Sequence, residues 1–259
     1  MSVTVKEILD YIISLNPEGK LCPEEGVLYG PAERSADAVM VCWMATVEAI
    51  REAAAKSCGI ILSHEMLTFH DYFPGKATPE PWAADRERLA LLKAHGITVL
   101  RAHGTVDPSH VMPHFIRAVG LSKPVVLGDV WSLHEEPPIA LGALARRLAD
   151  TLGMDAVRVT GDFGRVVRRV GVMVGGLGLD RHVNRWEKYL VSKGVEAIIA
   201  GETNDFAQRF ALDAHIGLIE TCHSATENPG LAALTEDLAR AFPAAKFLFH
   251  KCPVPWTTI

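Results

Sequence analysis

The feature that most constrains this chain is an internal repeat. The segments AHGITVLRAHGTVDP (residues 94–108) and AHIGLIETCHSATENP (residues 214–229) each combine an apolar run of strand length, a histidine, an acid four residues later and a proline. His103 and Asp107 therefore correspond to His223 and Glu227. The preceding segments also correspond, with CGIILSHE (58–65) beside EAIIAGET (196–203). Two lobes of related design explain these matches, because a sequence repeat reflects a repeated structural unit.

Apolar runs of strand length alternate with amphipathic helical patterns along the chain, and this alternation predicts an α/β fold. We expect strands over 38–43, 59–62, 97–102, 170–174, 197–200, 216–221 and 246–249. Helices are expected over 47–57, 85–94, 139–152 and 181–192, and from residue 205. Pro137 and Pro138 are predicted to open the helix over 139–152, and Thr226, Asn228 and Pro229 to announce the final helix. Asp107-Pro108-Ser109 also has the pattern of a helix start.

The repeat predicts two similar, interleaved α/β lobes that form one compact structural unit. Residues 1–130 are expected to make the first lobe, joined by the returning C-terminus, and residues 131–259 the second. Ligands of parallel α/β sheets bind at the carboxyl ends of the strands, where loops and helix N-termini converge. We therefore expect the functional site in the cleft between the lobes.

Composition narrows the classes of function. The 259 residues have a formal net charge of −5, which gives no electrostatic reason to bind nucleic acid or an anionic membrane. Five cysteines, odd in number and without a CxxC pair, argue against a disulfide framework and favour the reducing cytoplasm. No apolar stretch reaches the roughly 18 residues that a membrane helix needs.

Histidines and acids follow three of the expected strands: His64 and Glu65, His103 and Asp107, and His223 and Glu227. Each pair alone is more typical of a solvated loop or a helix cap than of a site. Their recurrence in the repeat favours metal binding, because imidazole and carboxylate together suit Zn, Fe, Mn, Co or Ni. A carboxylate can bridge two metals, so one or two divalent ions per chain are expected. Metal-bound water would then act as a nucleophile near neutral pH.

The same residues carry a family resemblance over nearly the whole chain. EGVLYG, GIILSHE, HGTVD, VGVMVGGLG and CHSATENPGL resemble segments of the Nif-three-like family, a dinuclear-metal-centre hexamer family often labelled GTP cyclohydrolase 1 type 2 homologues. The resemblance implies metal ligands at His64, Asp107, His223 and Glu227, with His103 as a nearby ligand or supporting residue. It also implies a nucleotide-like substrate such as GTP, and a homo-hexamer built as a trimer of dimers.

The chain departs from the family at Glu65, where the family has a second histidine. A carboxylate at this position can still ligate a metal, and a harder one, or it can replace the second metal as a proton-transfer group. We therefore assign Glu65 and His103 as candidate catalytic residues, and Glu65 also as a candidate ligand. The segment GETNDFAQ lacks the histidine that the family often has after its Gly-acid pair.

Two functions of different classes follow from these observations. The first is a metal-dependent hydrolase of a nucleotide-like or phosphoester substrate. The alternative is a non-enzymatic metal-binding or scaffold protein that acts through a ring-shaped oligomer. The loop GGLGLD (175–180) has two interpretations: a tight turn that needs glycine, or an anion site at a helix N-terminus. A loop with His70, Asp71 and Tyr72 is expected to border the site.

Overall fold

The apolar runs of the first half become strands of one buried sheet. The computed structural model describes residues 2–69 and 81–259, so the loop with His70, Asp71 and Tyr72 lies outside the described residues. Residues up to His110, together with Gly230–Cys252, form one unit, and Val111–Pro229 with Pro253–Ile259 form another. The C-terminal segment therefore returns to the first unit.

The first unit is built on a sheet with the strand order β13-β4-β5-β6-β2. Strands β4 (Ala38–Cys42), β5 (Ile60–Ser63), β6 (Thr98–Arg101) and β13 (Lys246–His250) pair in parallel, and β2 (Gly26–Tyr29) pairs antiparallel with β6. Every residue of β4, β5 and β6 is buried, as expected for parallel strands covered on both faces. A short pair, β1 (Val3–Thr4) with β3 (Ser35–Ala36), lies apart from this sheet.

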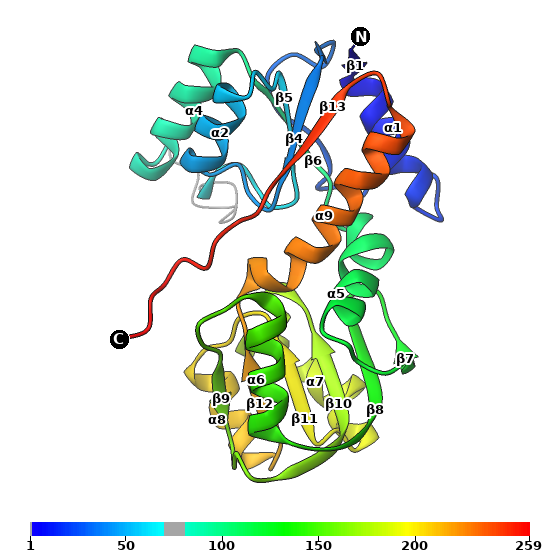
Figure 1. Cartoon of the computed structure of the whole chain (residues 1–259), viewed down its shortest axis with the longest axis vertical. Helices are drawn as coiled ribbons and strands as arrows, with labels where there is room; N and C mark the ends of the chain where they lie inside the picture. Colours follow the sequence, from blue (N-terminus) through cyan, green and yellow to red (C-terminus); the bar gives the residue numbers. More distant parts are fainter. Residues whose placement is uncertain (1, 70–80) are drawn as a thin grey trace. The chain divides into compact units, whose positions relative to one another are not determined.

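Helices cover both faces of this first sheet (Figure 1). Helices α2 (Val47–Ala55) and α4 (Ala83–His95) lie on one face, where Ile50 and Leu92 pack with Met40 and Ile61. On the other face lie α1 (Val5–Leu15) and α9 (His223–Ala241), whose residues from Gly230 belong to this unit. A capping box formed by Thr4 and Glu7 starts α1, and Thr46 caps α2.

The second unit is built on a sheet with the order β7-β8-β10-β11-β12-β9. Strands β10 (Val166–Met173), β11 (Ala197–Ala200) and β12 (Gly217–Glu220) are parallel, and they repeat the succession of β4, β5 and β6. The flanking strands β7 (Pro124–Leu127), β8 (Trp131–Ala140) and β9 (Arg158–Thr160) pair antiparallel. The α/β class is confirmed.

Helix α6 (Leu141–Leu152) covers one face of the second sheet, and α7 (Val183–Tyr189) and α8 (Asp205–Asp213) cover the other (Figure 1). The unit also contains α5 (Met112–Ala118), which follows a π-helical turn, η1, at Asp107–Val111. Short 3-10 helices occupy Gly175–Gly178 (η2), Asp180–His182 (η3) and Val191–Lys193 (η4). The predicted helix over 181–192 is therefore α-helical only over Val183–Tyr189.

Two sequence predictions of helix starts are wrong. Pro137 and Pro138 belong to β8, not to a helix start, and α6 begins at Leu141. They lie where the ladder between β8 and β10 shifts register, a position at which a missing N–H removes no ladder bond. The last helix begins at His223, before the proline signal, and Pro229 lies inside it. No helix among the described residues is both long and apolar enough to cross a membrane.

Candidate metal centre

His64 and Glu65 directly follow β5, and the backbone at both residues continues the parallel ladder. The His64 and Glu65 amides donate to the carbonyls of Cys42 and Trp43, at 3.0 and 2.6 Å. His64 is 1% exposed, and its Nδ1 lies 2.9 Å from the carbonyl oxygen of Ala102, which follows β6. The side chain is therefore held at the carboxyl ends of two adjacent strands.

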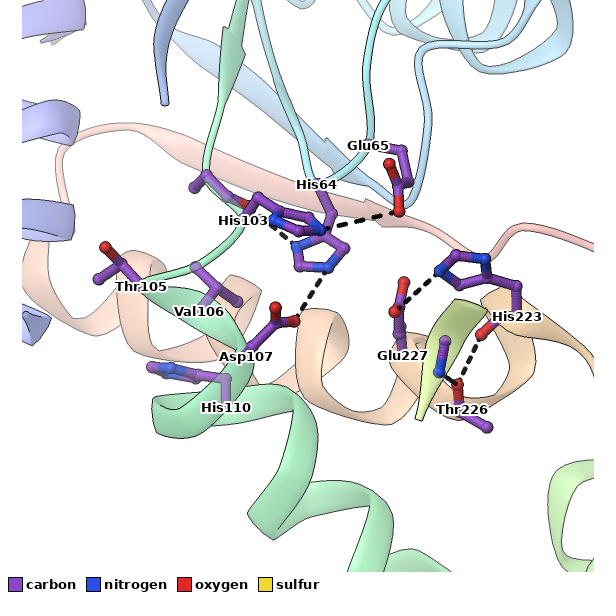
Figure 2. A network of polar contacts seen from close by, with 12 residues as sticks. His64, Glu65, His103, Thr105, Val106, Asp107, His110, His223, Thr226 and Glu227 are labelled. Atoms are coloured by element: carbon purple, nitrogen blue, oxygen red, sulfur yellow. Dashed lines mark hydrogen bonds and ion pairs between the residues drawn. The ribbon is translucent and has the colours of Figure 1, made fainter. Parts of the chain in front are cut away.

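Asp107 opens the π-helical turn after β6, and its Oδ1 lies 3.3 Å from Nε2 of His64 (Figure 2). Both ring nitrogens of His64 thus face oxygen acceptors. A neutral imidazole carries one proton, so one of these two contacts lacks a donor. A second proton, or a cation between Nε2 and the carboxylate, would satisfy both contacts. This is the arrangement in which a carbonyl fixes the tautomer of a metal-binding histidine.

His103 completes a triad in the first unit. One ligand atom from each of His64, His103 and Asp107 lies within 4.8 Å of the other two. The rings of His64 and His103 are tilted by 32°, with centroids 4.7 Å apart. Two imidazoles and a carboxylate form a borderline ligand set that fits a divalent transition metal. The residues present therefore fit the ion that the sequence predicts.

Two glutamates that the sequence interpretation missed support the His103 loop. Glu24 Oε1 lies 3.3 Å from Nδ1 of His103, and the opposite nitrogen, Nε2, lies 3.9 Å from Oε1 of Glu65. Glu25 accepts four hydrogen bonds of 2.7–2.9 Å, from the amides of Cys22, His103 and Thr105 and from the Thr105 hydroxyl. Burial raises the pKa of Glu25, but these hydrogen bonds outweigh burial and hold the pKa below its usual value.

Glu65, the departure from the family pattern, is 6% exposed and lies beside a buried cation that the sequence interpretation also missed. Its Oε2 is 3.5 Å from an Arg101 guanidinium nitrogen. Arg101 Nε in turn donates to the His64 carbonyl at 3.0 Å. Arg101 therefore offsets the extra negative charge that glutamate brings to this position. The other carboxylate oxygen of Glu65, Oε1, lies toward His103 of the triad.

The charge balance of the triad favours an ionised carboxylate. Burial raises the pKa of Asp107, but the hydrogen bond and charge of His64, with the charge of His103, lower it below its usual value. Glu65 acts in the opposite sense and raises it. An ionised Asp107 is the form that ligates a metal.

The second unit contains a matching arrangement around His223, in the first turn of α9. Nε2 of His223 lies 3.1 Å from Oε1 of Glu227, one helical turn later, and Nδ1 lies 3.4 Å from Oε2 of Glu202 (Figure 2 shows the first contact). Glu227 is 3% exposed. His223, like His64 and His103, has both ring nitrogens next to oxygen acceptors. A single ring proton can donate to only one of the two carboxylates, so a second proton or a bound cation would satisfy both contacts.

The glycine loop after β10 packs directly against this pair. Gly175 has a φ of +59°, and a Cβ there would overlap Glu227 Oε1 and lie 2.8 Å from His223 Nε2. The Gly175 amide donates to the Thr226 hydroxyl at 2.9 Å. The positive φ supports the tight-turn interpretation of GGLGLD, and the loop brings bare backbone against the histidine and the acid.

The comparisons with known proteins agree with the fold. The family model of Duf34/NIF3 (NGG1p interacting factor 3) matches residues 3–254. The chain belongs to the Duf34/NIF3 family. It is 24% identical to a Clostridium acetobutylicum protein named "GTP cyclohydrolase 1 type 2 homolog", covering 93% of this chain and 91% of the relative. A Pseudomonas aeruginosa protein of the same name is 27% identical, over 80% and 81% of the two chains.

A solved structure shares the fold closely. The protein described as "Structural genomics, protein ybgI, unknown function" superposes with a TM-score of 0.81 at 21% identity, covering 98% of this chain and 100% of that one. Within each unit, residues predicted as ligands lie next to each other: His64 beside Asp107, and His223 beside Glu227. That all five predicted ligands bind metal stays a prediction.

Proposed function

We propose that this member of the Duf34/NIF3 family is a metal-dependent hydrolase of a nucleotide-like or phosphoester substrate. The observation that carries the proposal is the buried triad of His64, His103 and Asp107, whose ligand atoms lie within 4.8 Å of one another. A divalent ion bound there would lower the pKa of a bound water and polarise the substrate. The two bacterial relatives named above support the nucleotide-like substrate through their names.

The protein residues divide into those that hold the ion and those that handle protons. His64 and Asp107 hold it, with the His64 tautomer set by the Ala102 carbonyl. Glu24 sets the tautomer of His103 and leaves Nε2 for the ion or for Glu65. Glu65, buried beside Arg101, is the proposed general acid or base, because a buried carboxyl held next to an imidazole can pass a proton to and from it.

We further propose that His223 and Glu227 contribute ligands, so that the chain binds one or two ions. The support is the excess of acceptors around His223, which matches that around His64 and His103. The homo-hexamer is proposed on the resemblance alone, and light scattering at micromolar concentration tests it. The five cysteines are odd in number and include no CxxC pair, which supports the cytoplasm as the proposed location.

The experiment pairs metal content with turnover. Protein loaded separately with Zn, Mn, Fe, Co or Ni is assayed against nucleoside triphosphates and simple phosphoesters, beside Asp107→Asn. The exposed Asp150→Asn on α6 is the matched control. The proposal expects turnover that Asp107→Asn removes together with metal, and that Asp150→Asn keeps. Stoichiometric metal without turnover on any substrate would overturn the hydrolase and favour the non-enzymatic scaffold.

A further inference from the structure

Strand β7 is an open edge of the second sheet. Among the described residues its only strand partner is β8, and Figure 1 shows it at the outer margin of its unit. The Gly128 amide donates to the Trp131 carbonyl of β8, so the neighbouring amide of Leu127 points to the open edge. Another strand can pair with such an edge, so a protein must either protect the edge or use it.

The middle of β7 is not protected against pairing. Its exposed side chains are Val125 and Leu127, with exposed fractions of 50 and 59%. Burial alternates along β7, so these two side chains lie on one face, while Val126 packs against the core on the other. Pro124 has no amide hydrogen, but it is the first residue of the strand and leaves the rest able to pair. A charge in the middle of an edge strand would oppose pairing, and the segment PVVL contains none.

The other edge strands of the two larger sheets expose their apolar side chains less. At the opposite edge of the second sheet, the exposed residue of β9 is Arg158. In the first sheet, the exposed residue of β13 is Lys246. Val27 and Leu28 of β2 are less exposed than Val125 and Leu127, and as neighbours in a strand they point to opposite faces. Strand β7 is therefore the edge that presents a one-sided apolar surface.

The residues on either side of this apolar segment have opposite charges. Lys123 precedes β7, Asp129 lies in the turn that follows it, and both are exposed. If two copies of β7 pair antiparallel about Val126, Lys123 of each copy faces Asp129 of the other, and Val125 of each faces Leu127 of the other. Each contact then occurs twice, as in any two-fold interface. Opposite charges and apolar side chains placed across from one another stabilise strand pairing, so the segment is complementary to itself.

From these observations we propose that β7 docks a second copy of this chain, whose own β7 pairs with it antiparallel and continues the sheet across a two-fold axis. The pairing names a surface for the proposed homo-oligomer, and it needs neither the metal centre nor turnover. Four residues of strand bury less than the roughly 1,200 Å² of a standard interface, so this contact alone gives a weak dimer whose population rises with concentration.

The test is a charge exchange, followed by sedimentation velocity of the full chain from micromolar to submillimolar concentration. Lys123→Asp and Asp129→Lys each turn two attractive pairs into two repulsive ones, so each alone should weaken association about tenfold. The double variant, Lys123→Asp with Asp129→Lys, restores opposite charges and should associate as the wild-type protein does. Lys251→Asp, at an exposed position outside the second unit, is the control and should leave association unchanged.

Leu127→Glu places a charge at the centre of the edge and should also weaken association, with an unchanged urea midpoint because Leu127 is exposed. Failure of the double variant to regain association would overturn the β7 pairing. An assembly whose mass no variant changes would overturn only this pairing and keep the proposed hexamer, whereas a wild-type monomer over the whole range would overturn both. Metal content and turnover test the hydrolase separately from all these outcomes.

Discussion

Comparing Gly175→Ala with Gly120→Ala separates two roles of Gly175: its backbone conformation and its close approach to His223 and Glu227. An alanine at a φ of +59° costs about 1–2 kcal/mol, because its Cβ crowds the neighbouring carbonyl oxygen. Gly120 provides the matched control, since it has a φ of +65° and no heavy atom within 4 Å of the position that a Cβ would occupy. Both variants should therefore lose similar stability in urea unfolding.

The two variants should differ at the site. The atoms that an alanine at position 175 meets are the ends of the His223 and Glu227 side chains, which can retreat at little cost in stability. The new Cβ would lie 2.8 Å from His223 Nε2, so this nitrogen must move by at least about 0.6 Å to reach the ordinary contact distance of 3.4 Å. Metal–ligand distances tolerate only about ±0.2 Å, so a ligand displaced this far no longer binds well.

The assay is competition for zinc against a chromophoric chelator, run beside urea unfolding on both variants. We expect Gly175→Ala to lose about tenfold or more in zinc affinity relative to Gly120→Ala, in line with the effect of disturbing groups next to metal ligands. Equal zinc affinity in the two variants would refute the reasoning, because His223 and Glu227 would then not contribute to binding.

Three further predictions concern Glu25, His134 and Glu65. Glu25→Gln should lower the free energy of unfolding by about 1–3 kcal/mol, because four hydrogen bonds to a charged carboxylate are weakened. The control, Glu33→Gln at an exposed position, should change this free energy by less than about 0.5 kcal/mol. Equal urea midpoints for the two variants would contradict the prediction. His134 is fully buried and its pKa lies below 6.5 because of burial, so the unfolded chain binds the proton more readily and stability should fall as pH drops below about 6.5. His134→Gln should flatten that part of the pH profile of unfolding, and an unchanged slope would rule out His134 as its source. Glu65→His should raise zinc stoichiometry toward two per chain and Glu65→Gln should reduce hydrolysis; if neither metal content nor activity changes, Glu65 has no role in the site.

The parallel strands were predictable because burial on both faces leaves a simple signal in the sequence. Strands β4 and β11 are continuous apolar runs, β5 and β6 have apolar centres, and the predicted bounds of all four agree with the observed ones within two residues. The antiparallel strands β2 (GVLY) and β7 (PVVL) were missed, because each is a short apolar segment that begins with glycine or proline and has only exposed and half-buried residues. Pro137 and Pro138 misled the prediction because a proline pair suits a helix start as well as an irregular strand.

The candidate ligands were predictable for a topological reason. His64, His103 and His223 each follow a parallel strand, and the carboxyl ends of adjacent parallel strands meet at one edge of a sheet. Glu24 was not predictable in this way, because it precedes an antiparallel edge strand. The only usable signal was the pair Glu24-Glu25 before GVLY, and it becomes informative only once β2 is known to pair with β6.

The repeat thus reproduces the histidines but not the groups that hold them. The Nδ1 atom of His103 faces Glu24, which comes from the segment before β2, whereas Nδ1 of His223 faces Glu202, which follows β11. In the first unit the position equivalent to Glu202 is His64, and the acid at this strand exit is the next residue, Glu65, which lies on the Nε2 side of His103 at 3.9 Å. The acid after the second parallel strand of each unit therefore lies on a different side of its histidine: Glu202 faces Nδ1 of His223, and Glu65 faces Nε2 of His103. Because a ligand atom and a tautomer-setting partner must lie on opposite nitrogens, Glu65 is placed to share an ion or a proton with His103, and Glu202 to orient His223.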